Sequence, residues 1–319
     1  MKHTLLVNGE IIPHVSGVEW SDDLSNAADT ISFSTDEQIE PGAPFALLYG
    51  ENTVLTGIIT EYTQNEPNRF IYGGYDFGFY LNKNSIIKQF NGITITDAIK
   101  RLCSDFSIPT GSVASLSSTV RKIYKGETIS DVFNELLELN TAKTGKDCYY
   151  YTCYDGTFNL KKYELDEDLT GYSGEAFTID STKTIASPSV SVSMEDLKNK
   201  VIITDNKSDT VSKLVTVSDS SSISKYGLLQ HIEKVDPEKE NNLTTIAKTK
   251  LAELNKLKTT IDLTMLGDYR MRKGVIMPIE CERLQLDGDY LIKSSKHSID
   301  SMKETVTVSL ELYDRSNIS

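Results

Sequence analysis

Histidine and cysteine side chains are the first candidates for metal or nucleophilic chemistry in this sequence. The chain has four of each: His3, His14, His231, His297, Cys103, Cys148, Cys153 and Cys281. No two histidines stand four residues apart, none adjoins a cysteine, and no Cys-x-x-Cys pair occurs, so the spacings that zinc sites use are missing. We therefore predict no metal ligands, and thiols that stay reduced and buried rather than a disulfide framework.

Runs of carboxylates could supply general acids, general bases or calcium ligands. They occur at Glu164–Asp168 and at Asp287 and Asp289. A glycosidase needs two carboxyl groups that face each other across a cleft, which neighbours in sequence do not provide. Neither run has the spacing of a calcium loop. We interpret both as solvated turns or linkers.

Motifs of nucleophilic and phosphate-binding sites are also missing. Gly171–Gly174 carries a serine between glycines but lacks the second spacer residue of a nucleophile elbow. The sequence has no Walker-type phosphate loop and no dinucleotide fingerprint after a strand. We predict no catalytic, cofactor-binding or metal-binding residues, and a protein that is not an enzyme.

One segment, Ile123–Val132, resembles the start of a LysM peptidoglycan-binding module, in which a strand, a glycine turn and a capped helix follow one another. A complete module would continue with a second helix and a closing strand within about fifty residues, whereas here a tyrosine-rich hairpin begins near Tyr149. We prefer the plainer interpretation of a strand-to-helix turn that needs Gly126 and an N-cap at Thr128.

The charge of the chain narrows its possible partners. Its 319 residues carry 33 basic and 46 acidic side chains, a net charge of −13. A groove for nucleic acid or an anionic membrane surface would need clustered Lys and Arg, which do not occur. The N-terminus turns polar too early for a signal peptide, and no apolar run approaches the roughly 20 residues that cross a bilayer. We expect neither specific nucleic-acid binding nor a membrane partner.

The elements that would position any site are mostly strands. Asn8-Gly9 predicts a two-residue hairpin turn, and 30–34, 44–49, 54–62 and 70–72 read as consecutive strands with short turns. After about residue 175 strands resume, and they are separated by a turn at 206–209 and one helix. The expected strands there are 201–204, 213–217, 261–265, 290–292 and 305–312.

The middle of the chain has helical periodicity. Thr94–Asp97 resembles a capping box, with Asp in place of Glu, at the start of a helix that Pro109 and Gly111 end. A second helix begins at Thr128, and a hairpin around Asp155-Gly156 follows it. These elements predict a compact α+β unit inserted in a β context.

A weak internal repeat suggests a duplicated β module. Residues 42–48 lead through a turn to 57–60, and residues 274–279 lead in the same order to 288–292. We expect a mainly β fold with two β-barrels and an α+β insertion. The expected domains are 1–89 for the first barrel, 90–163 for the insertion, and 164–319 for the second barrel with a helix at 242–257, with part of 164–205 as a possible completion of the first barrel.

Five segments in order resemble a known family. They are Gly73–Asn84, Ile99–Gly111, Thr144–Lys146, Ser224–Gln230 and Gly267–Gly274. Together they are similar to baseplate hub proteins of contractile phage tails and phage-tail-like bacteriocins, in the PBSX-type prophage branch with late control protein D-like relatives. The likeness runs from about residue 45 to 315.

This resemblance implies a structural role and a set of partners. In that family each subunit carries two tail-tube-like barrels, so a homotrimer offers six similar modules to the sixfold tail tube and a threefold face to the central spike. Partners would be the tube protein and the spike protein, with tape-measure and LysM-containing baseplate proteins as further candidates. The chain would be made in the bacterial cytoplasm and assembled into the baseplate of a virion tail or tail-like particle. The alternatives are a peptidoglycan-binding, LysM-like component and a cell-wall hydrolase component of such a tail.

Overall fold

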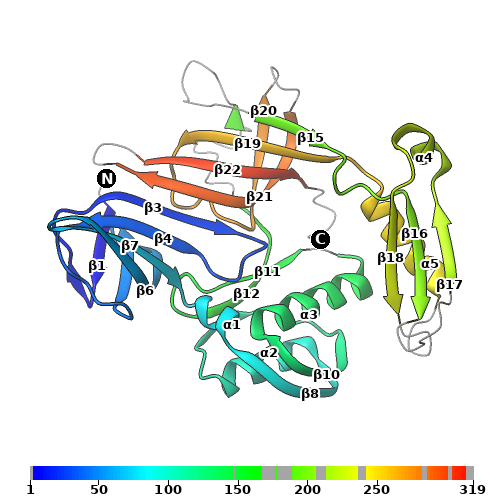
Figure 1. Cartoon of the computed structure of the whole chain (residues 1–319), viewed down its shortest axis with the longest axis horizontal. Coiled ribbons are helices and arrows are strands. Elements are labelled where there is room, and N and C mark those ends of the chain that lie inside the picture. The colour runs from blue at the N-terminus through cyan, green and yellow to red at the C-terminus, as the bar shows by residue number, and fades with distance from the viewer. Residues whose placement is uncertain are drawn as a thin grey trace. The chain divides into compact units, whose positions relative to one another are not determined.

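The computed structural model describes residues 3–146, 148–166, 177–178, 189–205, 213–235, 242–281, 286–300 and 304–313. The chain divides into two compact units (Figure 1), one made of residues 1–189 and 262–319 and the other of residues 190–261. We call them the first and the second unit and describe each by itself.

In both units more of the described residues lie in strands than in helices. The helices are α1 (Phe79–Lys83), α2 (Ile95–Asp105), α3 (Ile129–Thr144), α4 (Ser220–Tyr226) and α5 (Leu243–Leu254). The strands up to residue 165 are β1 (His3–Val7), β2 (Glu10–Ile11), β3 (Ser16–Asp23), β4 (Thr30–Thr35), β5 (Pro44–Tyr49), β6 (Asn52–Glu66), β7 (Arg69–Asp76), β8 (Ser85–Thr94), β9 (Thr110–Val113), β10 (Thr119–Thr128), β11 (Tyr149–Thr152), β12 (Phe158–Lys162) and β13 (Glu164–Leu165). The later strands are β14 (Phe177–Thr178), β15 (Ser189–Ser193), β16 (Lys200–Asp205), β17 (Lys213–Ser218), β18 (Gln230–Val235), β19 (Lys258–Leu266), β20 (Val275–Cys281), β21 (Leu286–Ile299) and β22 (Glu304–Leu312).

One long sheet joins the two ends of the sequence in the first unit. Its strands follow the order β2-β1-β5-β6-β7-β4-β3-β21-β22-β19. The central junction is the antiparallel pair β3–β21, in which Trp20 lies opposite His297 and Asp22 opposite Ser295. Figure 1 shows the blue N-terminal strands and the orange C-terminal strands meeting at this pair. The complete sheet therefore requires that the last fifty residues pair with the first twenty-five.

Alternating residues of the N-terminal strands build the core beneath this sheet. The inward side chains include Trp20, Phe33, Leu47, Ile59 and Tyr72, each at most 1% exposed. Their neighbours along each strand are more exposed, so these strands have the period of two that a half-buried sheet requires. The buried apolar area supplies most of the stabilisation of this part of the fold.

The α+β unit has its own core between α2, α3 and the strands β8 to β12. Thr94 and Thr128 cap α2 and α3 by accepting hydrogen bonds from the backbone N–H groups of Asp97 and Asp131, and Asp131 completes a capping box. The inward faces of the helices bury Ile99, Leu102 and Phe133 against Phe158. β8 and β10 form a two-stranded ribbon whose inward residues belong to the same core.

The second unit is a three-stranded sheet covered by α5. β16 lies in the middle, antiparallel to β17 and parallel to β18. Val201, Ile203 and Val235 pack against Ala247 of α5. Asp219 caps α4 by accepting hydrogen bonds from the backbone N–H groups of Ser221 and Ser222.

The mainly β fold class with an α+β unit is confirmed. Asn8 and Gly9 adopt positive φ in the β1–β2 turn, α2 and α3 begin after the predicted caps, and α5 falls within the predicted 242–257. The predicted turn at 206–209 lies outside the described residues. Both passages of the predicted repeat form antiparallel meanders, β5-β6-β7 and β20-β21-β22.

The described strands do not close into barrels; through β3–β21 they form one open path instead. Within residues 164–205, β13 and β14 run parallel to β20, a strand of the C-terminal part. The domain boundaries at 89/90 and 163/164 stay a prediction.

Two glycines in the β6–β7 pair allow a matched test of this packing. A side chain at Gly57 would overlap the backbone carbonyl of Tyr75, whereas one at Gly73 would meet only the flexible end of Glu61. We expect Gly57→Ala to lower the free energy of unfolding by about 3 kcal/mol, and Gly73→Ala to change it by less than about 1 kcal/mol. Urea unfolding followed by circular dichroism measures both; equal losses would contradict the close approach at Gly57.

Candidate functional site

A buried ionic cluster lies where the N-terminal and C-terminal strands of the first unit meet. It contains Asp22, Asp29, Asp76, Arg272 and Lys273. The three carboxylates and Lys273 are at most 3% exposed. Charges are seldom buried unless they are paired and hydrogen-bonded, so this cluster needs a structural explanation.

Strand ends position the carboxylates. Asp22 is near the end of β3, Asp29 precedes β4, and Asp76 ends β7; β4 is the neighbour of both β3 and β7. Arg272 and Lys273 arrive from the loop between β19 and β20. The sheet order thus brings together groups that are about 250 residues apart in the sequence.

The hydrogen bonds of Lys273 fix this loop in place. Its ammonium nitrogen Nζ donates to Asp29 Oδ1 at 2.6 Å and to the backbone carbonyl oxygens of Asn26 and Asp23 at 3.2 and 3.3 Å. Its backbone N–H donates to the carboxylate of Asp22 at 3.2 Å. Asp22 also accepts from the backbone and the hydroxyl of Ser295 at 3.0 and 2.8 Å.

Asp76 extends the cluster to the α+β unit. Its Oδ1 accepts from the backbone N–H groups of Asp29 at 3.1 Å and Gly78 at 2.9 Å. Its second oxygen has no hydrogen-bond partner among the described residues. Burial, and then the charge of Asp29, raises the pKa of Asp76 well above its usual value, so its carboxyl tends to keep a proton.

The other members also show the effect of burial. Loss of solvation raises the pKa of Asp22, and the neighbouring Asp29 adds to the rise. Burial alone would lower the pKa of Lys273, but the charges of Asp29 and Asp22 outweigh it and the pKa is raised. A proton on Asp76 reduces the excess of carboxylates over cations in the cluster.

Aromatic rings enclose the cationic side of the cluster. The guanidinium carbon of Arg272 lies 4.0 Å from the ring centre of Tyr154 and 4.8 Å from that of Trp20. Its Nη1 donates to the Val54 carbonyl at 2.6 Å. Such a sandwich stabilises a cation that has lost part of its water.

His297 continues this stack on Trp20. The two ring centres are 3.8 Å apart and nearly parallel. One ring nitrogen of His297 faces Glu304 Oε1 at 2.8 Å and the other faces the Met271 carbonyl at 3.0 Å. Both partners are acceptors, so the ring satisfies both when each nitrogen carries a proton. Glu304 also lies 3.4 Å from His3.

A small cavity of about 200 Å³ opens beside the cluster. It is lined by Tyr150, Tyr154, Arg270, Arg272 and Lys273, among others. The carboxylates themselves are buried behind it, so the cluster offers no cleft with two accessible carboxyl groups of the kind that a glycosidase needs.

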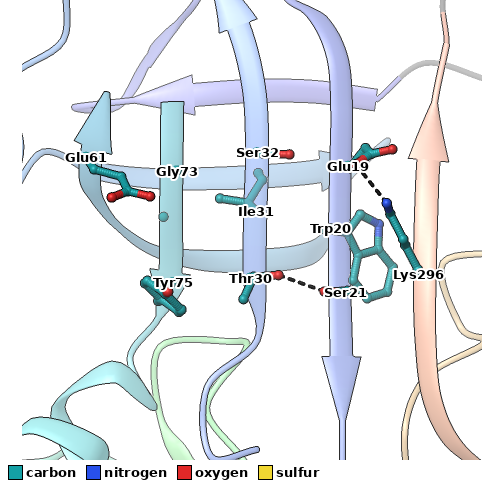
Figure 2. A pocket seen from close by; sticks show the side chains of 11 residues that line it. Glu19, Trp20, Ser21, Thr30, Ile31, Ser32, Glu61, Gly73, Tyr75 and Lys296 are labelled. Carbon is teal, nitrogen blue, oxygen red and sulfur yellow. Dashed lines mark hydrogen bonds and ion pairs between the residues drawn. The ribbon is translucent and has the colours of Figure 1, made fainter. Parts of the chain in front are cut away.

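The solvent face of the sheet carries a shallow groove of about 360 Å³ across β21, β3, β4 and β7. Figure 2 shows Glu19 bonded to Lys296 and Ser21 bonded to Thr30 along it, at 3.0 and 2.7 Å. Gly73 has no side chain, and Glu61 lies over it. Most of the lining residues are small or polar, and two carboxylates against one ammonium group make this face mildly acidic.

A second exposed surface lies on the outward face of the β8–β10 ribbon. Ile87 is 86% exposed and Ile123 is 51% exposed. Lys125 lies opposite Ile87, and Arg121 follows on the same face. The exposed isoleucines and the neighbouring cations give this face a mixed apolar and basic character.

Among the described residues that the sequence suggested for chemistry, His3 and His297 both face Glu304, at 3.4 and 2.8 Å, whereas the other two histidines pair elsewhere. His14 pairs with Asp36 and His231 with Glu233, both at 3.0 Å. Cys103, Cys148 and Cys153 are buried, while the side chain of Cys281 and the Gly171–Gly174 motif lie outside the described residues. Glu164 lies in β13, and Asp289, in β21, lies opposite Pro278 of β20.

The LysM-like start does not continue as such a module. Within residues 123–163, of which 147 is not described, β10 leads to α3 and then directly to the β11–β12 hairpin. Across the described ranges no group of three or more His, Cys, Asp or Glu side chains could hold a metal ion. No helix in them is both long and apolar enough to cross a membrane.

Sequence reasoning missed the ionic cluster because nothing in the pattern of a single strand marks its members. Two of the five family-like segments do contain them: Gly73–Asn84 includes Asp76, and Gly267–Gly274 includes Arg272 and Lys273. A search for charged residues within those segments could have found three of the five.

The raised pKa of Asp76 predicts a specific pH dependence of stability. Below the usual pKa of an aspartate both states hold the proton; as pH rises from about 4, the unfolded chain loses it first and the folded state is penalised. The wild type should therefore lose stability relative to Asp76→Asn as pH rises from 4 to 8. Urea unfolding at stepped pH measures this, with the exposed Glu51→Gln as the control that should follow the wild type. Parallel profiles for wild type and Asp76→Asn would contradict a protonated Asp76.

Two known proteins are similar in sequence to this chain over most of its length. Protein YqbQ of Bacillus subtilis (strain 168) is 28% identical over 247 residues, which cover 76% of this chain and 73% of that protein. The phage-like element PBSX protein XkdQ of the same organism is 25% identical over 256 residues, which cover 79% and 76%.

Solved structures share the fold. A 43 kDa tail protein of prophage MuSo2 from Shewanella oneidensis has a TM-score of 0.72 at 16% identity, with 98% of each chain covered. A tail protein from Neisseria meningitidis MC58 also has a TM-score of 0.72 at 16% identity, with 97% and 95% covered. The E. coli c3393 protein, described as a type VI secretion component similar to T4 tail proteins gp27 and gp5, has 0.54 at 12% identity, with 98% and 77% covered.

The resemblance inferred from the five segments is confirmed, since the PBSX protein is a homologue and the fold is that of phage tail proteins. A family model described as YQBQ-like matches residues 18–312, and the chain therefore belongs to the YQBQ-like family.

Proposed function

We propose that this chain is a structural, non-enzymatic protein of a phage-type tail, and that it acts there as a homotrimeric baseplate hub subunit between the tail tube and the central spike. The observation that carries the proposal is the match of the whole fold to prophage tail proteins, with 98% of both chains covered in one case. Homology to a protein of the PBSX element supports the same role.

The internal repeat gives a physical reason for the hub role. The meanders β5-β6-β7 and β20-β21-β22 place two similar antiparallel units in one subunit. Three subunits then offer six such units to a sixfold tube and three whole chains to a threefold spike, with heterologous contacts that close into a ring. Duplication thus resolves a mismatch of symmetry without a second protein.

The surface of the first unit suits a role in assembly. The groove of Figure 2 has two carboxylates, Glu19 and Glu61, against one lysine, Lys296. A channel lined by such a face would repel polyanions and would not hold passing DNA. The exposed isoleucines of the β8–β10 ribbon offer an apolar contact for a neighbouring protein.

The alternative functions have less support. A cell-wall hydrolase would need an accessible pair of carboxyl groups or a metal site, and the described carboxylate cluster is buried. A LysM-like binding module would need a second helix after α3, where β11 follows instead. The same proposal includes tape-measure and LysM-containing baseplate proteins as further partners, and a chain that is made in the bacterial cytoplasm and assembled into the baseplate of a tail or tail-like particle.

Counting copies in the assembled particle tests the hub assignment. We expect electron cryo-microscopy of the particle base to find three copies of this chain in a ring between tube and spike, with more carboxylates than amines along the channel. The isolated chain can remain monomeric, because ring closure can require tube or spike as a template. One copy or six copies at the base would contradict the trimer, and a channel lined mainly by Lys and Arg would contradict the role given to the groove.

A further inference from the structure

The closest pair in the buried cluster has the composition of a condensation site. Lys273 Nζ lies 2.6 Å from Asp29 Oδ1, and their side chains are 2% and 0% exposed. An amine nitrogen in contact with a carboxyl oxygen is also next to the carbon of that carboxyl group. Burial excludes the water that would otherwise compete for both groups.

The surrounding acceptors orient the nitrogen of Lys273. The carbonyl oxygens of Asn26 and Asp23 take two of its hydrogens, and the third position points at Asp29. In the ammonium form this third position holds a proton that bonds to the carboxylate. After transfer of that proton, the same position holds the lone pair of the amine, directed at the carboxylic acid.

Two further residues provide what such a reaction needs. Arg272 Nη2 lies 3.5 Å from Asp29 Oδ2, which has no hydrogen-bond partner among the described residues, so a negative charge that develops on this oxygen faces a guanidinium group. The carboxyl of Asp76, bonded to the backbone N–H of Asp29, keeps a proton because burial raises its pKa. In the reaction proposed below, Asp76 is the group assigned to give this proton to the departing oxygen and to regain one from the nitrogen.

We propose that Lys273 and Asp29 form an intramolecular isopeptide bond, which covalently joins the β19–β20 loop to the start of β4. The ion pair first becomes amine and acid by transfer of one proton; because the pKa of Lys273 is raised, this amine form is the minor one. The nitrogen then attacks Cγ of Asp29, the C–N bond forms, and the excess charge on Oδ2 faces Arg272. The C–Oδ1 bond breaks, Oδ1 leaves as water, and nothing is oxidised or reduced.

The electrostatics of the cluster favour the product. Condensation removes one buried cation and one buried anion and leaves a neutral amide. Asp22 then remains opposite Arg272, whose Nε is 3.6 Å away, beside a protonated Asp76. Because burying an ion pair is costly even when it is well paired, its replacement by an amide relieves that penalty. The cavity of about 200 Å³ that Lys273 lines gives the released water a way out.

Intact mass spectrometry of the denatured full chain tests the proposal directly. We expect the wild type to be lighter than its sequence by one water molecule, about 18 Da. Protease digestion should give one branched peptide that contains both Asp29 and Lys273. A wild-type mass equal to that of the full sequence would overturn the proposal without any variant.

Matched variants identify the reacting groups. Lys273→Arg keeps the positive charge but cannot condense, and Asp29→Ala removes the carbon that is attacked, so both should have their full sequence mass. Asp76→Ala should leave a large fraction of the chain at full mass, since it removes the group that carries the proton. Water loss that persists in Lys273→Arg would show a reaction elsewhere and would overturn the assignment of the bond to Lys273. Complete condensation in Asp76→Ala would overturn the role given to Asp76.

Discussion

The fold of the first unit depends on bringing charged groups from both ends of the sequence into one dry place. Lys273 and Arg272 can lose their water only where Asp22 and Asp29 already lie side by side, and the carboxylates can be buried only when the cations arrive. Removing one partner of such a set leaves an unpaired buried charge and typically costs about 3–5 kcal/mol. Because the cations and the carboxylates each require the other, the cluster stabilises the native arrangement of the strands and would be unstable in any other arrangement.

Strand pairing and the cluster support each other. The β3–β21 pair sets Asp22 opposite Ser295, whose backbone and hydroxyl both donate to it, and sets Trp20 opposite His297. A slip of one residue would turn Trp20 and Asp22 to the solvent face together. Register, ring stacking and charge pairing therefore all favour the same alignment of the N-terminal and C-terminal strands.

Local sequence signals predicted the elements well and their association poorly. The Asn8-Gly9 turn, the caps at Thr94 and Thr128 and the α5 pattern all depend on interactions within a few residues, which the sequence displays directly. The junction β3–β21 joins residues more than 270 positions apart, and nothing in either strand names its partner. Because this pairing could not be predicted, two barrels were expected instead. Each passage of the repeat, taken alone, is a meander that could close on itself.

The candidate site was harder still to predict, because its members are single charged residues at strand ends. Asp22, Asp29 and Asp76 look like ordinary turn residues, and Lys273 precedes a glycine in a segment that reads as a loop. Only the order of the strands shows that these positions meet. The family-like segments contain three of the five cluster residues, because residues that must be buried together as charges can be replaced by few others.

The hub role proposed above would call for rigid subunits, and the position of the cluster bears on that need. Loops are usually the least stable parts of a protein, and the β19–β20 loop would be expected to open first. Here it is held through Lys273 to Asp29, Arg272 to the rings of Trp20 and Tyr154, and Met271 to His297. The same contacts reach β3, the β11–β12 turn and β21, so opening this loop would release all three at once. Local opening therefore requires the loss of the whole junction, and the first unit is expected to move as one body under load.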